Sequence, residues 1–72
     1  MLMTTKHVFM EIREFIYQLQ KDETVDAVYF HSGMLNGMIN FASDADIISL
    51  NTWVLLYKLI CKIQNEKIKE IS

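Results

Sequence analysis

Proline is absent from the 72 residues, and the chain has only one cysteine and two glycines. The lack of proline removes the residue that most strongly breaks helices, so it favours helical structure along the whole chain. Cys61 alone cannot form an intramolecular disulfide or a cysteine-based zinc site. Since small secreted folds usually depend on such cross-links, we expect a cytoplasmic protein.

The sequence also lacks a basic excess, a long apolar run and a targeting segment. Its formal net charge is −2, whereas nucleic-acid-binding domains are commonly basic. The longest apolar run, residues 53–57, is far too short to cross a bilayer. Polar residues follow the first three, so no signal peptide is expected. These absences argue against nucleic-acid and membrane partners.

Apolar residues are present in excess, at 51% of the chain against 22% charged residues. A chain of this length buries only roughly 60% of its unfolded surface. One monomeric core therefore cannot hide so much apolar surface, and exposed apolar patches usually mark contacts with other proteins. We expect a single domain, residues 1–72, that binds a protein partner, a second copy of itself, or both.

Helical periodicity predicts an all-α, compact three-helix bundle with helices at about residues 5–21, 25–42 and 50–70. In the first segment the apolar residues fall within an arc of about 120°, and Thr4 or Thr5 can cap its start. Asp22 or Thr24 can cap the second helix, and Ser49 can cap the third. The helices are expected to associate through their apolar faces.

The third segment has its core residues spaced by three and four up to residue 63. Lys67 then falls in the middle of the apolar arc. We therefore expect the last turns to project from the bundle, or to pack on another chain through Ile68 and Ile71.

The middle segment admits a second interpretation, because Asn36-Gly37 is a strong hairpin signal. The alternative fold is α-β-β-α with the turn at these two residues. The helix is preferred because the bulky residues of this segment do not alternate with period two. On that helix the bulky side chains, including Phe30, Met34 and Phe41, lie on one half of the circumference, and Ser32 and the glycines lie on the opposite side. Either side is open as the core or as the interface.

Gly33 and Gly37 lie one turn apart on that opposite side, with Asn36 and Asn40 beside them. Each glycine inside a helix costs about 1 kcal/mol relative to alanine, so a compensating contact is expected. Three explanations remain open: close approach of a helix of the same chain, close approach of a second copy, or a bent or broken helix. All four residues are interface candidates.

A second interface candidate lies on the far side of the first helix. Met10 and Tyr17 are seven residues apart there and away from the main apolar arc. They form either a second contact stripe or two scattered surface residues, which are normal in proteins.

No catalytic or cofactor-binding constellation is evident. His31 is expected to be a hydrogen-bonded core residue, and neither histidine has the spacing typical of a metal site. Cys61 is expected to be buried and inert. The basic strip Lys58, Lys62 and Lys69 is best explained as a solvated helix face, although it could also contact phosphates or an acidic partner.

These observations predict a small non-enzymatic protein-interaction module: a regulator, inhibitor or adaptor of the kind that phages and other mobile elements often encode. It would dock on a protein partner, form a homodimer, or do both. The alternative is a compact helix-turn-helix DNA-binding regulator built from the second and third helices. Against that alternative, Asp44 and Asp46 precede the third helix, whose first turn contains no arginine.

Overall fold

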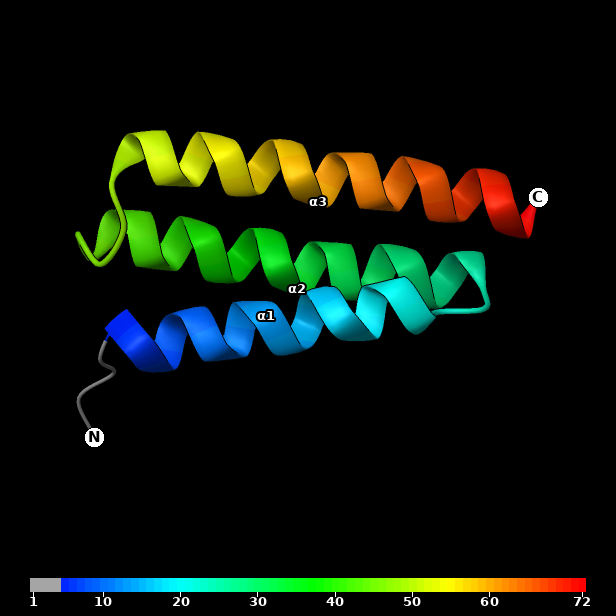
Figure 1. The fold of residues 1–72 in the computed structure, drawn as a ribbon, viewed down its shortest axis with the longest axis horizontal. Coiled ribbons are helices and arrows are strands. Elements are labelled where there is room, and N and C mark those ends of the chain that lie inside the picture. Colours follow the sequence, from blue (N-terminus) through cyan, green and yellow to red (C-terminus); the bar gives the residue numbers. More distant parts are fainter. Residues whose placement is uncertain (1–4) are drawn as a thin grey trace.

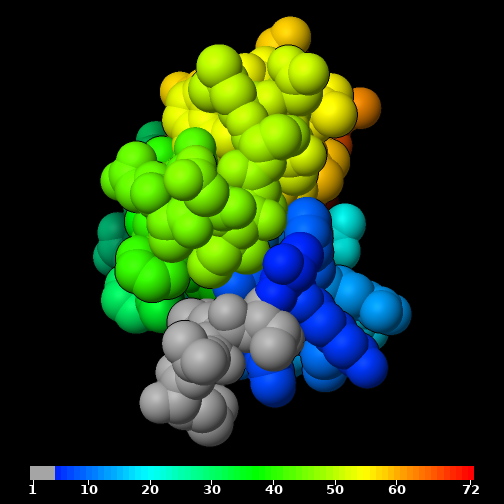
Figure 2. Space-filling model, turned by 90° about the vertical axis from the view of Figure 1, so that its left-hand side faces the viewer, coloured from blue at the N-terminus to red at the C-terminus, as the bar shows by residue number. Residues whose placement is uncertain are grey.

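The computed structural model describes residues 5–72, which form α1 (Thr5–Lys21), α2 (Val25–Asp44) and α3 (Leu50–Ile71). Successive helices alternate in direction and lie side by side (Figure 1). Viewed along the bundle, they occupy the corners of a triangle (Figure 2). The predicted all-α three-helix bundle is confirmed. The alternative hairpin at Asn36-Gly37 is wrong, because both residues lie inside the continuous helix α2.

The central element is α2, which packs against both α1 and α3, while those two helices contact each other less. Each helix contributes a row of side chains to one shared core, and the α2–α3 turn adds Ile48 to it. The buried apolar residues are Val8, Ile12, Leu19, Val28, Leu35, Ile39, Ala42, Ile48, Ile60 and Ile63.

Side-chain caps begin both later helices. The Thr24 hydroxyl accepts a hydrogen bond from the Ala27 amide at 3.1 Å, and the Ser49 hydroxyl accepts one from the Thr52 amide at 3.2 Å. Thr24 rather than Asp22 is therefore the cap of α2. The proposed cap at Thr4 lies outside the described residues.

The carboxyl end of α2 closes with a tight reversal at Asp46. Its amide bonds to the Ser43 carbonyl at 3.1 Å, and the Ile47 amide bonds to the Ala42 carbonyl at 2.8 Å. This pair of bonds is the Schellman arrangement, which places one residue in the left-handed region. That residue is Asp46, with φ 57°, where glycine is usual.

The structure decides which side of α2 is buried. Phe30, Met34 and Phe41 are exposed rather than buried, and Phe30 keeps 63% of its surface. Ser32 is buried instead, at 2%. At 100° per residue, the centre of the buried side lies roughly 60° around the helix from the centre of its apolar half. The inner side is set by the need to face α1 and α3 together.

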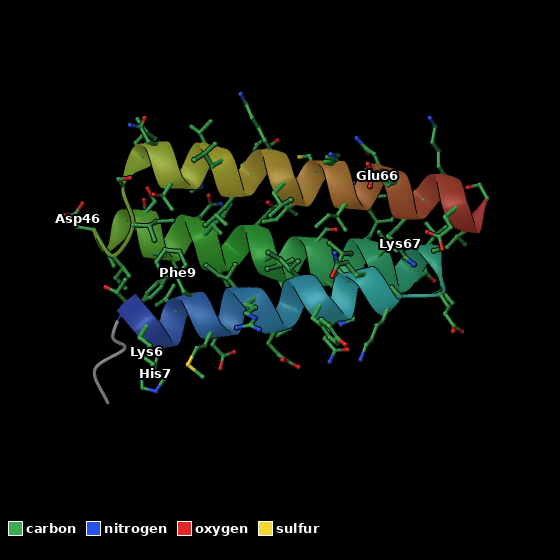
Figure 3. All side chains as sticks on the ribbon, viewed as in Figure 1. Lys6, His7, Phe9, Asp46, Glu66 and Lys67 are labelled. Carbon is green, nitrogen blue, oxygen red and sulfur yellow. The ribbon has the colours of Figure 1, made fainter. Side chains whose placement is uncertain are left out.

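The end of α3 also departs from the prediction. Ile68 and Ile71 pack against the core of the same chain rather than projecting from it. The Lys67 side chain is largely buried, and its Nζ lies 3.8 Å from a carboxylate oxygen of Glu70. Figure 3 shows Lys67 directed into the bundle beside α2. A long lysine stem can cover apolar surface in this way while its charge stays paired.

Replacing Asp46 by glycine should stabilise the fold by about 0.5–1 kcal/mol. Glycine removes the left-handed backbone strain of roughly 1–2 kcal/mol, and its greater freedom in the unfolded chain offsets part of that gain. Urea unfolding should show a higher midpoint at an unchanged slope. Asp44→Gly is the matched control, because Asp44 is the last helical residue; this variant should be destabilised.

Candidate interaction surfaces

The solvent side of α2 carries a row of large apolar side chains on either side of its two glycines. We call this surface the outer face of α2. It consists of Tyr29, Phe30, Gly33, Met34, Gly37, Asn40 and Phe41, all exposed. Asp26 and Asp44, also exposed, lie at its two ends.

Gly33 and Gly37 contact nothing across this surface. A Cβ atom placed on either glycine would have no neighbour within 4 Å outside its own helix. Of the three explanations for the glycines, close approach of a helix of the same chain is therefore wrong. A broken helix is also wrong, because α2 runs without interruption from Val25 to Asp44. Approach of a second copy and a bend of the continuous helix stay predictions.

The two asparagines differ in their surroundings. The Asn40 side-chain oxygen accepts a hydrogen bond from the Trp53 indole at 2.8 Å, which joins the edge of the outer face to α3. Trp53 in turn stacks on Tyr57, with ring centroids 5.2 Å apart. Asn36 is partly buried, and its oxygen has no hydrogen-bond partner. The outer face therefore continues through Asn40 onto an aromatic pair of α3.

His31 lies behind the outer face and pairs with Asp22. Its Nδ1 lies 2.6 Å from a carboxylate oxygen of Asp22, and its ring packs between Phe15 and Phe30. The predicted hydrogen bond of His31 is confirmed, but its side chain is 20% exposed and lies outside the buried core. The partner was missed, because the two residues are nine positions apart across the α1–α2 turn. The pair ties the start of α2 to the end of α1.

Met10 and Tyr17 are exposed on the outer side of α1, as predicted. Together with Arg13 and Glu14 they line a shallow hollow. The Lys21 ammonium lies 4.1 Å from the centre of the Tyr17 ring, so this ring already has a cation on one face. Charged neighbours make this surface more polar than the outer face of α2.

The basic strip lies on the outer side of α3. Lys58, Lys62 and Lys69 are all exposed, and Leu55 beside them is strongly exposed. The α2 and α3 helices lie nearly antiparallel (Figure 1), whereas the two helices of a helix-turn-helix cross at about 90–120°. Figure 3 shows Asp46 directed outward at the turn between them.

Tyr57 and Cys61 interact one turn apart on α3. The hydrogen bond to the Cys61 thiol raises the pKa of Tyr57 above its ordinary value of 10.0, and the charge of the thiolate and desolvation add to the increase. Tyr57 is among the exposed side chains, and Cys61 is only partly buried.

Within residues 5–72, no three histidine, cysteine, aspartate or glutamate side chains gather as a metal ion would require. None of the helices in that range is both long and apolar enough to cross a bilayer. No family model, curated protein or solved structure matches the chain.

Removing His31 should destabilise the fold by about 2–3 kcal/mol, because the Asp22 carboxylate would be buried without its partner. The Asp22 side chain is only 8% exposed, against 20% for His31. We expect this loss for His31→Leu in urea unfolding. Adding Asp22→Asn should restore part of it, since a neutral amide is less costly to bury than a carboxylate. Strictly additive losses in this double-mutant cycle would show that the pair is not coupled.

Replacing Cys61 by alanine should lower the pKa of Tyr57 toward its ordinary value, because the thiol is the main cause of the increase. The ultraviolet absorbance of tyrosinate measures this titration, and Tyr57→Phe identifies the phase that belongs to Tyr57. Since the folded-state pKa is raised, its contribution to stability is complete below pH 10.0 and is lost as the pH rises through the folded-state value. An unchanged titration in Cys61→Ala would contradict the assignment.

Proposed function

We propose that this chain is a non-enzymatic protein-interaction module, a small regulator, inhibitor or adaptor, that acts by docking on a protein partner, by forming a homodimer, or by both. The outer face of α2 is the binding surface. The observation that carries the proposal is the combination of exposed aromatic side chains with two glycines that contact nothing within the chain.

Energetics support an interaction at this surface. Tyr29, Phe30 and Phe41 are each more than half exposed. With Met34 they leave roughly 400 Å² of side-chain surface in water, taking about 150–250 Å² for each aromatic side chain. A contiguous patch of about 300–600 Å² is the largest on a typical monomer and is often functional. The end residues Asp26 and Asp44 supply the polar rim that interfaces commonly have.

The glycines support a closely packed partner rather than a loose one. Two glycines in the helix interior reduce helix propensity by about 2 kcal/mol relative to alanine. No space within the chain requires them, and neither has a positive φ. Their small size instead leaves the backbone of α2 uncovered between the aromatic side chains, where the backbone of a partner helix can pack closely.

DNA recognition has less support. The near-antiparallel packing of α2 and α3 (Figure 1) does not present one helix alone to a groove, as a helix-turn-helix does. The first turn of α3 also carries Leu50 and Asn51 but no base-reading arginine. The carboxylates of Asp44 and Asp46 just before it would repel phosphates.

The proposal can be tested by affinity capture with quantitative mass spectrometry from the cells that encode the protein. The tagged wild-type chain should retain at least one protein in near-stoichiometric amount, a second copy of the chain included. The Phe30→Ser/Phe41→Ser variant should retain at least ten-fold less of that protein, because two aromatic side chains of the outer face are removed. Circular dichroism should show that its helix content is intact.

The matched control is Met10→Ser/Tyr17→Ser, which removes two exposed apolar residues from α1 instead. This variant should retain the captured protein. If capture is equal for the two double variants, or falls only in the α1 variant, the outer face of α2 is not the binding surface. If nothing is captured in stoichiometric amount, the interaction function itself is contradicted.

A further inference from the structure

We propose that the occupant of the outer face of α2 is a second copy of the same face, packed antiparallel about a twofold axis that brings Gly33 of one copy level with Gly37 of the other. This inference rests on the proposed function and specifies the partner at the same surface. A symmetric dimer of this kind requires a self-complementary patch, in which residue i contacts j and j contacts i.

The outer face has part of that symmetry in its sequence. Three pairs of residues at equal distances from Leu35 match in kind: Gly33 with Gly37, Tyr29 with Phe41, and Asp26 with Asp44. Two other pairs, Met34 with Asn36 and Phe30 with Asn40, do not match. Leu35 itself is fully buried on the opposite side of the helix. An antiparallel twofold axis level with Leu35 therefore brings Gly33 of one copy level with Gly37 of the other at the centre of the contact.

The two edges of the face decide the direction of the second helix. At 100° per residue, Phe30, Met34 and Phe41 lie along one edge, and Tyr29, Asn36 and Asn40 lie along the other. An antiparallel twofold axis brings equal edges together, so that apolar side chains meet apolar ones. A parallel twofold axis would bring the apolar edge of each copy against the polar edge of the other. The distribution of side chains therefore favours the antiparallel dimer.

The antiparallel arrangement also gives specific partners. Phe30 of one copy comes within one residue, about 1.5 Å, of the level of Phe41 of the other copy on the same edge, as an aromatic pair. Tyr29 likewise comes within one residue of the level of Asn40 of the other copy. The Asn40 oxygen already accepts from Trp53, but its amide nitrogen remains a donor for the tyrosine hydroxyl. Gly33 and Gly37 allow the two helix backbones to approach closely at the centre.

The size of the surface indicates a reversible dimer. About 400 Å² of apolar side-chain surface per copy is half of the roughly 800 Å² per partner that a standard stable interface buries. The twofold axis also brings Asp26 of one copy toward Asp44 of the other, and this repulsion limits the contact to the central turns. Since α2 occupies one corner of the triangular bundle (Figure 2), neither α1 nor α3 lies in front of the face.

The first test measures the mass of the full-length chain by sedimentation equilibrium over a series of concentrations. Wild type should shift from monomer to dimer as concentration rises. Gly37→Leu should weaken the dimer by at least ten-fold, because the new side chain covers the backbone that the second copy approaches. Nothing within the chain obstructs that side chain, so Gly37→Leu should stay folded, with a thermal midpoint equal to or above that of wild type.

The matched control is Asn65→Leu, which adds the same side chain at an exposed position of α3. It should dimerise as wild type does. A wild type that stays monomeric throughout would overturn the inference, while the proposed docking on another protein would still be decided by the capture experiment. A dimer that survives in Gly37→Leu would also overturn it, because the contact would then lie on another face.

The second test determines whether the α2 helices of the two copies pack antiparallel or parallel. Two single-cysteine variants, Phe30→Cys and Phe41→Cys, are made in a Cys61→Ser background, carry different tags, and are mixed and oxidised. The antiparallel dimer brings positions 30 and 41 of different copies close enough for a disulfide, while equal positions lie more than 7 Å apart and cannot be bridged. The mixed disulfide should therefore predominate. Predominance of the two symmetric disulfides would show a parallel dimer and overturn the proposal.

Discussion

Burial of one side of α2 against two neighbours is the constraint on which the bundle depends. Leu35 and Ile39 are fully buried there, and α2 contacts both α1 and α3, whereas those two contact each other less. The Asp22–His31 pair reinforces this arrangement at the α1–α2 turn, and the Asn40–Trp53 hydrogen bond reinforces it on the α3 side. Without the inner side of α2, neither flanking helix would retain enough apolar contact to fold.

The exposed aromatic side chains follow from the same constraint. The inner positions of α2 are occupied by Val28, Leu35, Ile39 and Ala42, so the other bulky residues must lie on the solvent side. Roughly 400 Å² of apolar side-chain surface corresponds to about 10 kcal/mol of transfer free energy at about 25 cal/mol per Å². That gross quantity is comparable to the net stability of a whole domain, about 5–15 kcal/mol. A contact that covers the face therefore has a large driving force available.

The helices could be predicted from the sequence because caps, periodicity and the absence of proline all agree. The orientation of α2 could not. Its apolar residues cover about half of the helix circumference, so two arcs about 60° apart contain similar numbers of them. The arc that is actually buried includes Ser32, whose small side chain fits between close helices where Phe30 would not. The Asp22–His31 pair is equally invisible to helical periodicity, because it joins residues across a turn.

The fold of the single chain does not require glycine at position 33 or position 37. At both positions the backbone has ordinary negative φ, and a Cβ atom would meet nothing within 4 Å. Alanine at Gly33 and Gly37 would therefore fit the isolated bundle and would favour the helix by about 1 kcal/mol at each site. Neither packing nor backbone conformation within the chain accounts for glycine there. The proposed dimer would account for it, because glycine leaves the most room for a second backbone to approach.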